Sequence, residues 1–331
     1  MPEASLEDEV DPDDPVPIVS LDDLKLALKF VEHVRNAELE GSGLSNDTIQ
    51  RLRAPVQSLL DLEEDPDLEL CINLYITLGR TSQKDFNEAM NHLSVRFPDS
   101  KFLTYEACRK KVEELSGVVS LLHDMCINTC MAYTGPLSAL NHCRHCGEPR
   151  YDSSKRKPTP RQQFYTIPLG PQLQGLLRSL ETAKLVRYRR EETERTINEY
   201  SVESEDGTQS IEPPVISDYI HGQDYLKAVI SGDLQPDDLV LMLSIDGAQL
   251  YEHKASDCWI YIWVLMDLPP DMRYKKRFVM PGGFIPGPNK PKNVDSFLNC
   301  YKSGLCIIEN EGISVTSHTP KPIQAQHTAI R

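Results

Sequence analysis

The stretch Leu239–Pro288 decides the fold, and it reads LVLMLSIDGAQLYEHKASDCWIYIWVLMDLPPDMRYKKRFVMPGGFIPGP. It contains two long apolar runs rich in β-branched and aromatic residues, Leu239–Ile245 and Trp259–Met266, and a shorter run, Arg277–Met280. Glycine and proline separate the runs, a pattern that is typical of buried strands joined by short turns. The stretch therefore predicts three adjacent antiparallel strands of one sheet.

Asp246 stands where the first apolar run gives way to Gly247. A carboxylate at the end of a buried strand is unfavourable unless it is paired, solvated or bound to a metal. Asp-Gly is also a common turn pair. The local sequence leaves two roles open, an acid that begins a turn and a functional carboxylate at the end of the first strand.

The same segment resembles the central block of CACTA-type (En/Spm-like) DNA transposases. The resemblance lies in the IDGAQLY turn, the aromatic strand WIYIWVLMDLPP, the RFVMPGGFIPGPNKP segment and the VDSFL that follows. It implies an RNase H-like core with a triad of carboxylates, in which Asp246 is the first carboxylate and lies on the first strand. It also implies Mg²⁺ in an intact family member, because metal ions held by such acids activate the nucleophile and stabilise the leaving oxygen.

The resemblance also indicates where the other two acids belong. The second should follow the FIPGP segment and a helix, where residues 310–318 read NEGISVTSH and Ser317 stands at the matching position. The third falls beyond Arg331. Three nearby acids do not match catalytic positions and are expected to be turn and surface acids: Asp257, Asp267 and Asp271. With one triad carboxylate, we expect the chain to be a truncated, inactive copy that neither cleaves DNA nor transfers strands.

Length and composition bound the protein class. The 331 residues suffice for two or three domains and a sizeable core. No apolar run approaches the 18 residues of a membrane span, and the acidic N-terminus lacks a secretory signal. Nine cysteines, some closely paired, favour a reducing compartment over a disulfide framework. Together with the resemblance to transposases, this predicts a nuclear location and no membrane partner.

The acidity of the chain is concentrated at one end. The net charge is −15, but residues 1–70 hold 19 acidic and 5 basic residues, so the remainder is close to neutral. The whole-chain charge therefore does not argue against a DNA partner. Residues 1–19 are acidic and proline-rich and are expected to be disordered.

Residues 20–120 are expected to form a helical region. The first helix has apolar residues at positions 21, 24, 28 and 31, the spacing of an amphipathic helix, with Ser20 as a candidate N-cap. Further helices are expected from Ser45 toward Leu60, over Glu69–Leu78 and Ser82–Phe97, and over Thr104–Leu115 with Thr104 as its cap.

Two close pairs of cysteines follow, with twelve residues between the pairs: Cys126 and Cys130, then Cys143 and Cys146. Four thiolates brought together by two tight turns suit a tetrahedral Zn²⁺ site, and Gly147 after the second pair is typical of such a turn. His142 and His145 are alternative ligands, and a set of reduced cysteines without metal is the alternative interpretation. The block, down to its CGEPRY ending, also resembles the Cys-rich module that precedes the transposase core. We expect a zinc module over residues 121–152.

The segment 144–190 is basic, with 11 Lys and Arg against 3 Asp and Glu. It can form a DNA-phosphate face or a nuclear-import signal, or it can be a solvated helix face. The residues expected to contact DNA are Lys155, Arg156, Lys157, Arg187, Arg189 and Arg190.

The sequence thus predicts an α+β protein with an N-terminal helical region, a Cys-rich zinc module and a partial, mainly antiparallel RNase H-like core. Residues 153–214 form a basic segment and linker, in which 191–214 are expected to be a loop or a partly ordered linker. Residues 215–298 form the core and begin with a short helix, and 299–331 form an irregular tail. Two functions compete: a transposase-derived fragment that binds zinc and DNA, and a non-enzymatic zinc-dependent DNA-binding or adaptor protein derived from a transposon.

Overall fold

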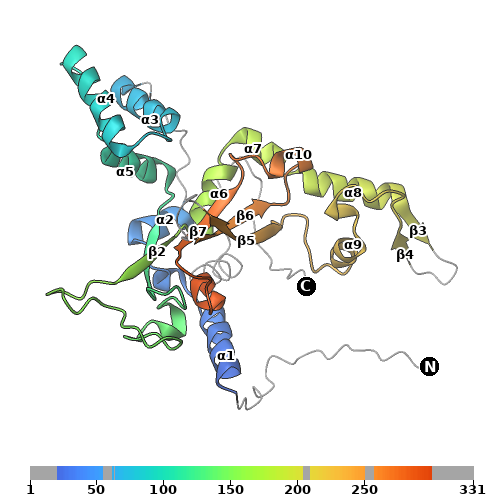
Figure 1. Ribbon diagram of the computed structural model, residues 1–331. Coiled ribbons are helices and arrows are strands. Elements are labelled where there is room, and N and C mark those ends of the chain that lie inside the picture. The colour runs from blue at the N-terminus through green and yellow to red at the C-terminus, as the bar shows by residue number, and fades with distance from the viewer. Residues whose placement is uncertain (1–20, 55–61, 63, 204–208, 250–256, 300–331) are drawn as a thin grey trace.

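The computed structural model describes residues 21–54, 62, 64–203, 209–249 and 257–299 (Figure 1). The fold combines helices with an antiparallel five-stranded sheet, which confirms the predicted α+β class. The strand order is β1-β2-β7-β6-β5, and β3 and β4 form a separate two-stranded ladder. The five strands of the main sheet are β1 (Leu121–Met125), β2 (Gln162–Thr166), β5 (Leu241–Gln249), β6 (Asp257–Leu265) and β7 (Met280–Pro286).

Strands β5, β6 and β7 form the antiparallel meander that the sequence predicts. The third strand, however, does not cover Arg277–Met280: it begins at Met280, after the short helix α10 (Pro270–Arg273) and a turn in which Phe278 N donates to Lys275 O. It then continues through Gly282 and Gly283. The Tyr261 ring lies against these glycines, and an added Cβ would come within 2.3 to 2.4 Å of it. The paired glycines are therefore part of the strand and make room for an aromatic ring.

Asp246 lies inside β5, paired with Ile260, because the strand continues to Gln249. The expectation that it ends the strand is wrong. Its side chain is exposed, so the desolvation cost of a buried carboxylate does not arise. Among the described strands, β5 has β6 as its only neighbour and forms one edge of the sheet.

The sheet also takes two strands from earlier in the chain, β1 and β2. β1 pairs with β2 along its whole length, and β2 pairs with β7 through Tyr165 and Thr166. The sequence predicts that the core begins at residue 215, but the first strand of the sheet begins earlier, at Leu121. The cysteine-rich segment is an insertion between β1 and β2 rather than a unit preceding the sheet.

One face of the sheet is covered by helix α6 (Leu169–Leu177). The main core joins this helix, the inward side chains of β2 and β6, and the segment after β7. Its buried members include Phe164, Leu173, Trp263, Leu265 and Phe297.

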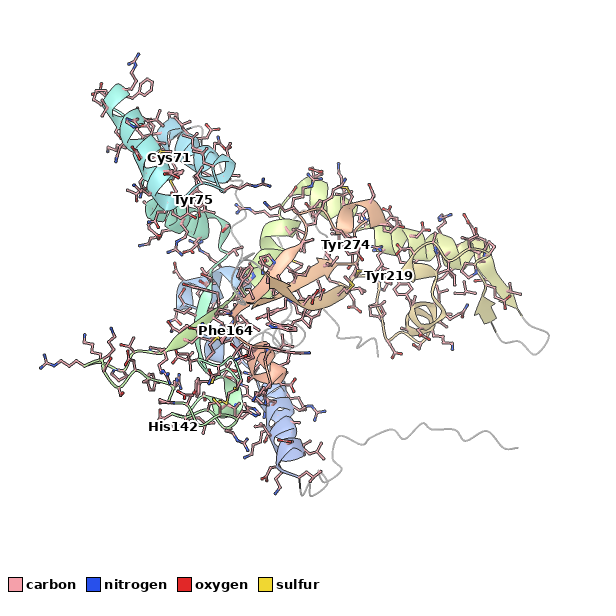
Figure 2. The ribbon with its side chains drawn as sticks, viewed as in Figure 1. Cys71, Tyr75, His142, Phe164, Tyr219 and Tyr274 are labelled. Carbon is pink, nitrogen blue, oxygen red and sulfur yellow. The ribbon has the colours of Figure 1, made fainter. Side chains whose placement is uncertain are left out.

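The N-terminal region is helical, as predicted, and comprises α1 (Asp22–Arg35), a 3-10 turn η1 (Leu39–Gly41), α2 (Asn46–Arg53), α3 (Pro66–Thr77), α4 (Gln83–Arg96) and α5 (Tyr105–Ser116). Side chains of Ser45, Ser82 and Thr104 accept hydrogen bonds from first-turn backbone N–H groups of α2, α4 and α5, so these three caps lie where the sequence indicates. Helices α3–α5 share a small core that contains Cys71 and Cys108, and they project away from the sheet (Figures 1 and 2). The candidate cap Ser20 lies outside the described residues, as do residues 1–19.

The predicted loop over 191–214 is wrong for much of its length. Helix α8 (Tyr188–Tyr200) follows the short helix α7 (Leu180–Leu185) and leads into the ladder of β3 (Ser201–Glu203) and β4 (Gln209–Ile211). Its sequence is polar, so its apolar pattern is weak. Arg189, Thr193 and Thr196 are nevertheless its buried residues, and the two threonine hydroxyls donate to backbone carbonyls one turn earlier. The short helix expected before the core strands is α9 (Gln223–Ile230), preceded by the 3-10 turn η3 (Tyr219–His221).

Candidate metal centre

The four predicted cysteines come together. The Sγ atoms of Cys126, Cys130, Cys143 and Cys146 all lie within 4.8 Å of one another, and those of Cys126 and Cys146 are 3.4 Å apart. A tetrahedral zinc site with Zn–S bonds of about 2.3 Å requires sulfurs about 3.8 Å apart. The four thiols can therefore hold one metal ion after small side-chain adjustments. In the part of the chain that the structure describes, no other group of three or more potential ligands meets this test.

The first cysteine pair is shaped by a tight turn. Thr129 has a φ of 58°, and its N–H donates to Cys126 O at 2.8 Å. The Asn128 N–H points at Cys126 Sγ at 3.4 Å. The Thr129 hydroxyl donates to Pro286 O at 3.3 Å, which ties this strained position to the end of β7.

The second pair is shaped by the turn that the sequence predicts. Gly147 has a φ of 75°, and its N–H donates to Cys143 O at 2.9 Å. A residue with a Cβ would be strained there. His142 and His145 are exposed and do not belong to the ligand group, although His142 lies in the same module (Figure 2).

The metal-free thiols differ in acidity. Burial raises the pKa of Cys126 to about 11, and it also raises the pKa of Cys130. Burial alone would also raise the pKa of Cys146. Hydrogen bonds from the backbone of Glu148 and the side chain of Asn128 outweigh this effect and lower the pKa to about 7. Because metals bind thiolates, metal binding must displace protons from the buried sulfurs, and acid must oppose it.

The cysteine group is anchored to the sheet and to α1. Cys130 O accepts hydrogen bonds from Lys292 N at 3.1 Å and Asn293 N at 2.9 Å, and Ala132 N donates to Ser296 Oγ at 2.9 Å. Phe30 of α1 packs against the buried cysteines in a separate apolar cluster. Any loss of order at the cysteines should therefore loosen both α1 and the segment that follows β7.

Asp246 is solvent-exposed, and its Oδ1 accepts a hydrogen bond from Gly247 N at 2.7 Å. It is not a member of any group of three potential metal ligands among the described residues. Ser317, which stands where the resemblance implies a second acid, lies outside those residues. The structure therefore describes only the first of the expected Mg²⁺-binding positions.

The open face of the sheet carries an apolar row that ends at Asp246. The strand register aligns five residues across the sheet, so their side chains share one face: Leu122, Tyr165, Phe284, Ile260 and Asp246. Leu122, Tyr165 and Phe284 are exposed and Ile260 is half-buried. Sequence analysis misses this row because it depends on the pairing of segments more than a hundred residues apart.

The predicted DNA-contacting residues do not form one surface. Lys155, Arg156 and Lys157 are exposed on the loop that leads into β2, whereas Arg187 and Arg190 lie at the start of α8. The loop and α8 project on opposite sides of the molecule (Figure 1). Arg190 is also paired with Glu194 at 2.9 Å.

Arg189 is buried, which contradicts its predicted contact with DNA. Its Nε donates to Asp267 Oδ1 at 2.6 Å, and its Nη2 donates to the carbonyls of Gln235, Pro236 and Asp238 at 2.6 to 3.2 Å. Burial alone would lower the pKa of Arg189, but the attraction of Asp267 raises it, so the guanidinium remains charged. Asp267 is itself 1% exposed, which makes its expected role as a surface acid wrong.

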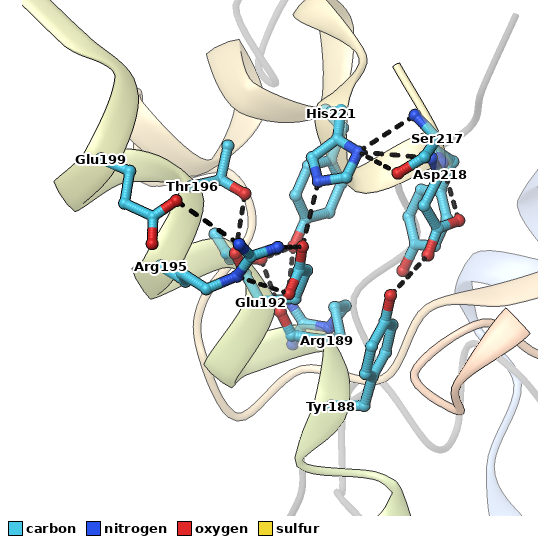
Figure 3. Close-up of polar contacts among 12 residues, drawn as sticks. Tyr188, Arg189, Glu192, Arg195, Thr196, Glu199, Ser217, Asp218 and His221 are labelled. Carbon is cyan, nitrogen blue, oxygen red and sulfur yellow. Dashed lines mark hydrogen bonds and ion pairs between the residues drawn. The ribbon is translucent and has the colours of Figure 1, made fainter. Parts of the chain in front are cut away.

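Other buried polar pairs hold the same region together. Arg273 makes two bonds of 2.6 Å with the carboxylate of Asp218. The backbone N–H groups of Ser217 and Asp218 donate to His221 Nδ1, so Nε2 carries the proton and donates to Glu192 Oε1 at 3.1 Å (Figure 3). These bonds tie η3 to α8 through Glu192 and to α10 through Arg273, and they do not converge on the cysteines.

No helix in the described parts of the chain combines the length and apolar character needed to cross a bilayer. Comparison of the sequence with models of protein families and with curated proteins, and of the structure with solved structures, finds no match.

Proposed function

We propose that this chain is a transposase-derived protein that binds zinc through four cysteines and binds DNA, and that these 331 residues do not cleave DNA by themselves. The observation that carries the proposal is a four-cysteine group inserted between two strands of the same antiparallel sheet that displays Asp246. The resemblance to CACTA-type transposases involves both features, and it is the source of the DNA-related part of the proposal.

Zinc is the metal that best fits the cysteine group. The donors are four sulfurs, a set that suits Zn²⁺ or an iron–sulfur centre and does not suit Mg²⁺ or Ca²⁺. Four protein ligands fill a tetrahedral shell and leave no position for a substrate. Cys126, Cys130, Cys143 and Cys146 would therefore hold a structural ion that fixes the insertion between β1 and β2.

DNA binding is assigned to the projecting loop. Lys155, Arg156 and Lys157 are consecutive and exposed, and cations of this kind bind phosphates with little dependence on base sequence. Arg189 takes no part in this proposal because it is buried against Asp267.

Neutralising the loop should weaken DNA binding. In the Lys155→Gln/Arg156→Gln/Lys157→Gln variant, affinity should fall by a similar factor for unrelated duplexes. The slope of log K against log salt should become less steep by up to about three, because each phosphate contact contributes about 0.9. Fluorescence anisotropy over a salt series measures both quantities.

A matched control removes three exposed lysines from the helical unit instead: Lys84→Gln/Lys101→Gln/Lys110→Gln. It changes the net charge equally and should leave the slope close to that of the wild type. Absence of binding at low salt, also in a chain lacking the acidic residues 1–20, would contradict DNA binding and favour the adaptor function.

We also expect the chain to be inactive in cleavage. Two catalytic metal ions require several carboxylates. Among the described residues, Asp246 belongs to no group of three or more potential metal ligands. A nicking assay on transposon-end DNA with Mg²⁺ or Mn²⁺ should give no product above background. Product from the wild type that disappears in Asp246→Ala would show that the site is complete.

A further inference from the structure

The side chain of Arg150 joins the two ends of the cysteine-rich segment. Arg150 follows the second cysteine pair in the sequence, and its partner Asp124 precedes the first pair. Arg150 Nε and Nη2 lie 2.8 and 2.7 Å from Asp124 Oδ2. The two side chains are only 15% and 13% exposed, so water screens this ion pair weakly.

The rest of the guanidinium holds the stretch of chain between the two cysteine pairs. Arg150 Nη1 donates to Ser138 O at 2.7 Å and to Leu140 O at 3.4 Å. Its Cζ lies 4.8 Å from the centre of the Tyr133 ring and 5.0 Å from that of the Tyr151 ring. One planar group thus binds a carboxylate and two carbonyls at once, which is a geometry that the fork of an arginine allows and a lysine ammonium does not.

Both partners of the ion pair are fixed by further hydrogen bonds. Asp124 Oδ1 accepts from Gln163 Nε2 of β2 at 2.9 Å, and the Asp124 carbonyl accepts from Tyr133 N at 2.9 Å, beyond the turn of the first cysteine pair. The Arg150 N–H donates to Asn141 O at 2.8 Å, just before the second pair. The ion pair therefore connects the backbone around one cysteine turn with the backbone around the other.

A connection of this kind is what a four-cysteine site needs. Each tight turn fixes the two sulfurs of its own pair, but the turns alone do not fix one pair against the other. A tetrahedral ion requires all four sulfurs about 3.8 Å apart. Groups that hold ligands in place beforehand reduce the ordering cost of binding. Such outer partners typically change metal affinity by about 10- to 100-fold.

We propose that Arg150 is a positioning residue of the metal centre, which by binding Asp124 holds the two cysteine pairs at the separation that one metal ion bridges. This inference rests on the proposed zinc site. Arg150 acts without touching the ion, and it acts as a unit with Asp124. Because the ion and the ion pair order the same two turns, each stabilises the other.

The experiment measures the zinc affinity of full-length variants by competition with a chromophoric chelator. Arg150→Gln and Asp124→Asn should each weaken zinc binding by about 10- to 100-fold. Arg150→Lys keeps the charge without the planar fork, so it should restore little of the affinity. The double variant Asp124→Asn/Arg150→Gln should lose about as much as the weaker of the two single variants, because both substitutions break one interaction.

The matched control is Arg144→Gln, which removes the same charge from an exposed side chain between the two cysteines of the second pair. It should bind zinc like the wild type. The visible absorption of Co²⁺-loaded protein gives a second measurement. At saturating metal, Arg150→Gln should show the tetrahedral spectrum of the wild type, because all four thiolates remain.

The outcomes separate this proposal from the zinc site itself. Wild-type affinity in both Arg150→Gln and Asp124→Asn, or an equal loss in Arg144→Gln, would overturn the positioning role and leave the zinc site standing. Losses that add in the double variant would overturn it as well. A wild type that binds no zinc would overturn both. If Arg150→Gln fails to fold, Asp124→Asn and Arg150→Lys, which preserve the size of the side chain, decide the question.

Discussion

Removal of the proposed zinc ion with a chelator should lower the Tm of the protein by more than about 10 °C. Structural zinc contributes an apparent binding free energy of about 10–16 kcal/mol in finger peptides, and this energy stabilises only the folded state. The buried cysteines share an apolar cluster with Phe30, Met131, Tyr133 and Leu137, so loss of the metal should loosen these side chains as well. The hydrogen bonds from Lys292 and Asn293 to Cys130 O extend the effect to the segment after β7.

The same prediction can be tested without a chelator. Cys143→Ser replaces a buried ligand and should reduce both metal content and Tm. Cys258→Ser is the matched control, because Cys258 is a free cysteine of β6 outside the ligand group, and it should retain the metal. Melting curves followed by circular dichroism, with and without chelator, give the comparison. Equal Tm values for the untreated wild type, the chelated wild type and Cys143→Ser would contradict a structural metal.

The second large effect concerns the buried ion pair of α8. Asp267→Ala should lower the free energy of unfolding by about 3–5 kcal/mol, because it leaves the charge of Arg189 buried without its partner. Val240 N would also lose its acceptor, Asp267 Oδ2, at 2.8 Å. Urea unfolding at neutral pH measures the difference.

The control for this experiment is an exposed ion pair that joins α8 to the segment before β5. Arg190 lies 3.5 Å from Asp237, and both side chains are about half exposed. Asp237→Ala should therefore cost at most about 1 kcal/mol. If Asp267→Ala costs no more than Asp237→Ala, the pair with Arg189 does not hold α8 to the sheet as described.

The features that the sequence predicts correctly are local ones. Ser45, Ser82 and Thr104 begin helices because a hydroxyl satisfies nearby backbone N–H groups, and this depends on a few neighbouring residues. The cysteine pairs are local in the same sense, because each turn brings its two sulfurs together. The antiparallel succession of β5 and β6 follows from apolar runs with polar residues between them.

The features that the sequence misses depend on distant segments. β1 and β2 join the sheet through pairing with each other and with β7, and no short pattern reveals that register. Helix α8 is polar, and the residues that bind the buried Arg189 side chain lie 36 to 78 residues away. The number of basic residues in the segment therefore predicts that Arg189 contacts DNA, whereas its side chain is buried.

Helix α1 shows a third kind of limit. Its apolar period correctly predicts a helix, but the period does not say which apolar residues face the body of the protein. Phe30 and Leu26 attach the helix to the apolar cluster of the cysteines, and Leu24, Leu28 and Val31 remain exposed. The open row on the sheet that ends at Asp246 arises in the same way, because burial is decided by what the rest of the chain places against each face.

The central claim, a zinc centre formed by Cys126, Cys130, Cys143 and Cys146, is tested most directly by the metal content of the purified chain. Protein expressed in zinc-replete medium and analysed by mass spectrometry should contain about one zinc per chain, since one four-ligand set is present. Cys143→Ser should contain clearly less, and Cys258→Ser should match the wild type. A wild-type chain with less than about a tenth of a zinc would contradict the claim.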